Sequence, residues 1–148
     1  MSFSNPWKSY HKVATQTASP GQLVLMLYDG AIRFLERALT GFAFDDPAEF
    51  NASISNNILR AQAIINELNS SLDMEKGGDI SINLRQLYTY FDRRMTESNI
   101  RKEQEGIKEV IERLTVLRDA WSTMLGRQTA SQPQFDSSAE SVLAAVGA

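Results

Sequence analysis

The residue types that most often carry catalysis are scarce in this sequence. It contains a single histidine, His11, and no cysteine among its 148 residues. Without cysteine the chain cannot build a thiol nucleophile, a disulfide or a cysteine-based zinc or iron–sulfur site. A di-iron bundle needs a Glu-x-x-His motif on each of two helices, which one histidine cannot supply. We therefore expect His11 to be a surface or docking residue and not a metal ligand.

The charged residues form no recognisable catalytic motif either. One segment alternates acidic and basic residues at the spacings of ion pairs on a helix surface, which favours a solvated helix face. Arg93 and Arg94 lie near the end of a predicted helix. They could interact favourably with the helix dipole, or they could pair with an acidic partner. Gly77-Gly78 lacks the remaining residues of a phosphate-binding loop. In the segment of alternating charges mentioned first, the acidic residues are Glu103, Glu105, Glu109 and Glu112. None of these features indicates catalysis, so we expect no enzyme activity, no cofactor and no metal.

Length and composition are those of one compact globular domain. Hydrophobic residues make up 43% of the chain and charged residues 22%, and the net charge is -3. This acidic balance argues against a general nucleic-acid binder. The longest apolar run extends only from Leu23 to Tyr28, whereas a membrane-spanning helix needs about 20 apolar residues. The N-terminal stretch has no apolar core after a basic start, so we expect no secretory signal and a cytoplasmic location.

Four segments carry apolar residues at the three- and four-residue spacings of amphipathic helices. Ser19 and Asp46 each precede a proline, and both are expected to be N-caps. Asp79 or Ser81 is expected to cap the third helix, after a break at the glycine pair. The fourth is expected to fade near Gly126. The expected helices span about residues 20–40, 47–72, 80–98 and 103–125.

Short connections between these segments predict antiparallel neighbours, so the expected fold is all-α, an up-down four-helix bundle. Residues 19–125 would form the bundle. Residues 1–18 carry several apolar side chains and are expected to dock as an N-terminal segment that caps a groove. Residues 126–148 are rich in Ser, Gln and Ala, which indicates a disordered tail with room for a short helix over 139–146.

Several apolar residues fall outside the predicted core stripes. On the first helix, Leu25 and Met26 lie more than about 100° from the centre of the stripe. Leu59, Tyr90 and Val116 lie outside the apolar stripes of the second, third and fourth helices, respectively. Single exposed apolar residues are normal in soluble proteins. Residues of this kind on different helices could instead line a groove for another amphipathic chain, and we expect these five to contact a partner.

The order of certain motifs adds a family resemblance, which extends over about residues 5 to 121. The stretches that carry it are Asn5-Pro6-Trp7-Lys8-Ser9-Tyr10, Thr17-Ala18-Ser19-Pro20-Gly21-Gln22-Leu23, Met26-Leu27-Tyr28-Asp29-Gly30-Ala31-Ile32, Ala61-Gln62, Leu87-Tyr88-Thr89-Tyr90 and Leu117-Arg118-Asp119-Ala120-Trp121. With these motifs the sequence resembles the flagellar secretion chaperones, bacterial chaperones dedicated to flagellin.

The resemblance implies a client and a mechanism. The client would be the C-terminal segment of flagellin, which is disordered in the free monomer. The chaperone would prevent premature polymerisation and help to present flagellin to the cytoplasmic domain of the flagellar export gate. The resemblance also adds Tyr10, Leu23, Tyr28 and Leu87 as partner contacts, although Tyr28 and Leu87 lie on core stripes. The segment with Tyr10 would cover an empty groove and move when the client arrives.

A second reading stays open at this point. The off-stripe residues would also suit a self-associating helical-bundle scaffold or regulator with no client chain. The chaperone, by contrast, is expected to be a monomer or a weak homodimer. Light scattering on the isolated protein separates the two readings.

Overall fold

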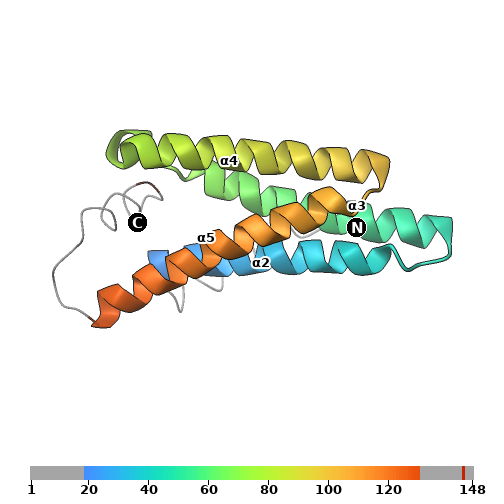
Figure 1. Ribbon diagram of the computed structural model, residues 1–148, viewed down its shortest axis with the longest axis horizontal. Coiled ribbons are helices and arrows are strands. Elements are labelled where there is room, and N and C mark those ends of the chain that lie inside the picture. Colours follow the sequence, from blue (N-terminus) through green and yellow to red (C-terminus); the bar gives the residue numbers. More distant parts are fainter. Residues whose placement is uncertain (1–18, 131–144, 146–148) are drawn as a thin grey trace, which may run out of the picture.

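The computed structural model describes residues 19–130 and Ala145. Within this part of the chain there are four helices and no strand (Figure 1). Both α2 and α4 pack on α3 and on α5, and successive helices run in alternating directions. This arrangement confirms the all-α four-helix bundle. The helices are α2 (Pro20–Gly41), α3 (Pro47–Ser70), α4 (Met74–Arg101) and α5 (Glu105–Ala130).

The first two helices begin where the sequence predicts. The Ser19 hydroxyl accepts a hydrogen bond from the backbone N–H of Gln22, and the Gln22 side chain accepts one from the backbone N–H of Ser19, both at 3.2 Å. Asp46 accepts from the backbone N–H of Glu49 at 2.9 Å. These caps satisfy N–H groups that have no partner inside the helix.

The start of α4 differs from the prediction. Neither Asp79 nor Ser81 is the cap; the helix begins at Met74, and the Asp73 carboxylate accepts two backbone N–H bonds from its first turn. The predicted glycine break appears as a kink within α4, where Gly78 has φ 52° and ψ -126°. Glycine adopts this left-handed conformation without a steric penalty. One helical turn therefore precedes the kink.

The end of α5 also differs. The helix does not fade near Gly126 but continues to Ala130. A single glycine inside a helix costs about 1 kcal/mol relative to alanine, which is too little to end a helix by itself. Segment 1–18, and the short helix predicted over 139–146 apart from Ala145, lie outside the described residues, so the division of the chain at residues 18 and 125 stays a prediction.

The core is a continuous column of side chains from all four helices. Leu35 of α2, Ile65 of α3, Phe91 of α4 and Leu114 of α5 are each fully buried. At one end the Trp121 indole N–H donates to a backbone carbonyl oxygen of α2 at 2.7 Å and joins α5 to α2. No helix of the described residues is long and apolar enough to cross a lipid bilayer. This core fixes the positions of the partly exposed side chains between α4 and α5.

Candidate functional site

In Figure 1, α5 runs diagonally away from α4 toward one end of the bundle. An apolar hollow is lined mainly by residues of these two helices. Its cavity volume is about 170 Å³. Ile80 and Leu84 contribute from α4, and both are half-buried. The wall on the α5 side includes Ala120, which is exposed. The full lining is Tyr28, Ile80, Leu84, Leu117, Ala120, Trp121 and Met124.

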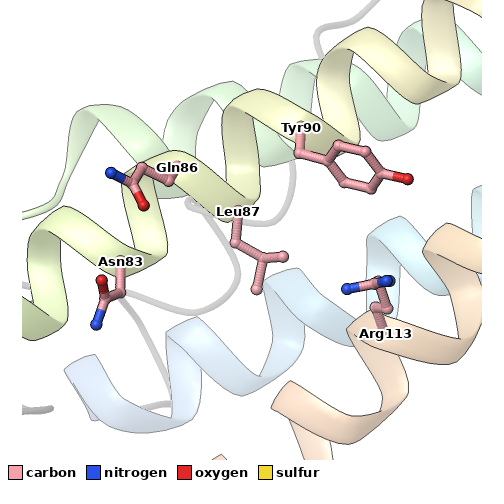
Figure 2. A pocket seen from close by; sticks show the side chains of 5 residues that line it. All are labelled: Asn83, Gln86, Leu87, Tyr90 and Arg113. Carbon is pink, nitrogen blue, oxygen red and sulfur yellow. The ribbon is translucent and has the colours of Figure 1, made fainter.

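A second, more polar hollow lies further along the same two helices (Figure 2). It has a cavity volume of about 470 Å³. Figure 2 shows Leu87 extending from α4 toward the side on which Arg113 of α5 lies. Because α4 and α5 are antiparallel, Ile80 lies near Met124 at one end and Tyr90 lies near Arg113 at the other. The two hollows lie along the same pair of helices, and we refer to them together as the α4–α5 groove. The second hollow is lined by Asn83, Gln86, Leu87, Tyr90 and Arg113.

A charged network closes the polar end of the α4–α5 groove. The Glu109 carboxylate accepts from the Tyr90 hydroxyl at 2.6 Å and from Arg94 Nε at 3.0 Å. Arg113 Nε lies 3.1 Å from the same carboxylate. The hydrogen bonds from Tyr90 and Arg94 lower the pKa of Glu109, and the bond to Glu109 raises the pKa of Tyr90. The network ties α4 to α5 and fixes the Tyr90 ring at the rim.

This network revises two expectations about charges. The predicted solvated face holds for Glu103, Glu105 and Glu112, which are exposed, but not for the half-buried Glu109. Arg94 does meet an acidic group, and that group belongs to α5 of its own chain. The spacing of charges along one helix could not show a pairing between two helices.

Tyr28, which lines the apolar end, is paired with a second buried tyrosine. Tyr28 of α2 is 2% exposed and Tyr88 of α4 is 1% exposed. Their hydroxyl oxygens are 2.5 Å apart and share a hydrogen bond. Burial raises the pKa of Tyr28 to about 12, so its hydroxyl is neutral at physiological pH. Tyr28 therefore contributes an uncharged side chain to the apolar end of the groove.

The structure brings some of the predicted partner contacts together. Tyr28, Leu87 and Tyr90 line the α4–α5 groove. Val116 is 64% exposed on α5, beside the groove residue Leu117. Core packing was the alternative interpretation for the two residues that lie on core stripes. Tyr28 is buried, as that interpretation expects, whereas Leu87 is half-buried. Tyr10 lies outside the described residues.

The remaining predicted contacts lie elsewhere. Leu59 is 57% exposed on α3 and lines neither hollow. Leu23, Leu25 and Met26 are half-buried on α2 and also line neither hollow. Leu23 and Leu25 pack against the core, so placing Leu25 outside it was wrong. Because α2 contacts both α3 and α5, its buried arc is wider than one stripe.

Sequence reasoning missed most of the groove. The three- and four-residue spacing places Ile80, Leu84, Leu117 and Trp121 on the apolar core stripes of their helices, and Ala120 was not singled out as a partner contact. Their helical spacing is correct, but a stripe does not reveal that α5 diverges and leaves part of it uncovered. An amphipathic chain can occupy such a groove with its apolar face. Within residues 19–130, no group of three or more His, Cys, Asp or Glu residues could hold a metal ion.

Comparisons with known proteins agree with this picture. A family model described as flagellar protein FliS matches residues 3–128. The flagellar secretion chaperone FliS of Bacillus subtilis is 35% identical over 121 residues, which cover 82% of this chain and 86% of that protein. FliS of Salmonella typhimurium is 38% identical over 118 residues, with coverage of 77% and 85%. FliS of Campylobacter jejuni is 30% identical over 126 residues, with coverage of 85% and 95%. The chain belongs to the FliS family of flagellar secretion chaperones.

Proposed function

We propose that this chaperone binds the C-terminal segment of flagellin in the α4–α5 groove. The observation that carries the proposal is the apolar lining left uncovered between α4 and α5 in a chain of this family. Ten residues separate Ile80 from Tyr90 on α4, which gives the groove a length of about 15 Å. That length accommodates about three turns of a client helix, enough for apolar anchors at positions i, i+3, i+4 and i+7.

The two ends of the groove suit an amphipathic client. The apolar end accepts the client's buried face, and removal of that face from water drives the association. At the polar end, Arg113 and the Tyr90 ring are available to the edge of the same helix. A disordered segment that folds on binding usually buries about 1,000 to 3,000 Å². This area exceeds one groove, so the client also covers surface outside it, such as Val116 on α5 and Leu59 on α3.

This binding mode accounts for a chaperone's task without an enzymatic step. Covering the apolar face of the client removes the surface that would start polymerisation. In this proposal the protein acts in the cytoplasm as a monomer or weak homodimer, without a cofactor or nucleic acid. It then hands flagellin to the cytoplasmic domain of the export gate, which competes for the client.

The test is a charged substitution in the groove with a matched control. Ala120 is exposed and lines the groove, whereas Ala52 is exposed on α3 and lines neither hollow. Ala120→Glu and Ala52→Glu make the same change in charge and in helix propensity. We expect Ala120→Glu to weaken binding of a C-terminal flagellin fragment at least about tenfold, or about 1.4 kcal/mol.

Isothermal titration calorimetry gives both affinities, and circular dichroism checks that both variants keep their helix content. The Ala52→Glu protein is expected to bind within about twofold of the unmodified protein, as surface changes usually have small effects. Equal affinities for the two variants would show that the client does not enter the α4–α5 groove.

A further inference from the structure

A residue from the C-terminal part of the chain is packed against the corner between α3 and α4. The Ala145 side chain is fully buried. Its carbonyl oxygen accepts a hydrogen bond of 2.7 Å from the backbone N–H of Asp73, the N-cap residue of α4. An amide that precedes a helix has no helical partner. Ala145 therefore satisfies a donor that the bundle itself leaves without an acceptor.

The contact depends on the absence of a side chain at Gly77. A Cβ atom built there would lie 2.5 Å from Ala145 Cα and 2.6 Å from Ala145 Cβ. It would also collide with the Ser81 hydroxyl, which is buried and donates to the carbonyl oxygen of Asp73 at 2.7 Å. We call this space, bounded by Asp73, Gly77 and Ser81, the Gly77 niche. This niche has room for a residue no larger than alanine.

The two adjacent glycines have different roles. A Cβ at Gly78 would meet no atom within 4 Å, and the positive φ of 52° accounts for glycine at that position. Gly77 has no positive φ, and its close neighbours Ser81 and Ala145 account for glycine there. The glycine pair therefore combines a kink in α4 with a receptor site for another part of the chain.

The Gly77 niche adjoins the apolar end of the α4–α5 groove. Ser81, which bounds the niche, directly follows the groove residue Ile80 in the chain. On the other side of the groove, Met124 of α5 lies six residues before Ala130. The chain thus leaves α5 on one side of the groove and reaches Ala145 on the other. The intervening residues 131–144 can extend over about 45 Å, so their length sets no obstacle.

We propose that the Gly77 niche is a docking site for the chain's own C-terminal segment, anchored by Ala145, and that the docked segment competes with the client for the α4–α5 groove. The second part rests on the proposed function, whereas the docking itself does not. Docking would keep the empty groove from attracting other chains. The client would displace the segment at a cost in apparent affinity, because the apparent dissociation constant equals the intrinsic one divided by the undocked fraction.

The docking is tested in the full-length protein by amide hydrogen exchange at Asp73. Ala145→Leu introduces a side chain that the niche cannot hold, and Ala148→Leu is the same change three residues further on. We expect Asp73 to exchange about three- to tenfold faster in Ala145→Leu than in Ala148→Leu, which corresponds to a docked form that is two-thirds to nine-tenths populated. Equal exchange in these two proteins would overturn the docking.

A second pair of variants tests the same site from the bundle side. Gly77→Ala places a methyl group in the niche, and Gly126→Ala adds the same group where it would meet no atom within 4 Å. Faster exchange at Asp73 only in Gly77→Ala supports the docking. Unchanged exchange in both contradicts it.

Competition is tested by titrating the two leucine variants with a C-terminal flagellin fragment. Ala145→Leu is expected to bind about three- to tenfold more tightly if the docked form is two-thirds to nine-tenths populated. Equal affinities, together with accelerated exchange at Asp73, would overturn the competition. If neither variant binds the fragment, the proposed function fails, and the exchange rates still decide whether the segment docks.

Discussion

Removing one hydroxyl from the buried tyrosine pair is expected to cost more than removing both. Tyr28 and Tyr88 are 2% and 1% exposed, and each hydroxyl has the other as its hydrogen-bond partner. Tyr28→Phe leaves the Tyr88 hydroxyl buried without that partner, and Tyr88→Phe does the same to Tyr28. A buried polar group without a partner costs about 1 to 3 kcal/mol.

The double variant has a different balance. With both tyrosines replaced by phenylalanine, no buried hydroxyl remains, and exchanging both partners of a hydrogen bond for apolar groups can be nearly neutral. Single variants that each lose about 2 kcal/mol and a double variant that loses about 1 kcal/mol would give a coupling energy of about 3 kcal/mol.

Urea unfolding of the four proteins measures this cycle. With an m value of about 2 kcal/mol/M, each single variant should unfold at a urea concentration lower by about 1 M. Circular dichroism follows the transition, and unchanged m values verify that the unfolded states are comparable. Additive losses, with a coupling energy near zero, would refute the reasoning. That result would mean that each hydroxyl finds water through the adjoining groove.

Two further predictions concern the core and the charged network. Ile65 is fully buried, so Ile65→Ala should lower the free energy of unfolding by about 2 to 5 kcal/mol, measured by urea denaturation. Because the folded-state pKa of Glu109 is lowered, its stabilising contribution is present above the unfolded-state pKa of about 4.3 and is lost as pH falls through the folded-state value. Thermal melts should therefore show Glu109→Gln less stable than the unmodified protein at pH 7, with the difference shrinking as the pH falls below about 4.3. A difference that stays the same from pH 7 to pH 3 would contradict this.

Local signals explain why the first two helix starts could be predicted. Ser19 and Asp46 combine a capping side chain with a following proline, and both act within one helical turn. The third start was missed because Asp73 caps a single turn before the kink at Gly78. No amphipathic stripe can be recognised in a segment of that length. The kink itself was indicated correctly by the glycine pair.

Contacts between distant segments explain what the sequence could not show about the site. The α4–α5 groove exists because α5 diverges from α4, and an angle between helices leaves no mark on the spacing within either one. Leu87 and Tyr90 were found through a motif and an off-stripe position, respectively. Ile80, Leu84 and Leu117 have the spacing of core residues, and only the structure shows that they are partly uncovered.

The central claim is that a flagellin segment folds onto this bundle. The most direct test is calorimetric titration of the full-length protein with a fragment covering the C-terminal segment of flagellin, repeated at several temperatures and accompanied by circular dichroism. We expect one-to-one binding, a negative change in heat capacity and a gain in helix content beyond the sum of the two components. A folded protein that shows no binding, and instead self-associates in light scattering, would contradict the proposed function.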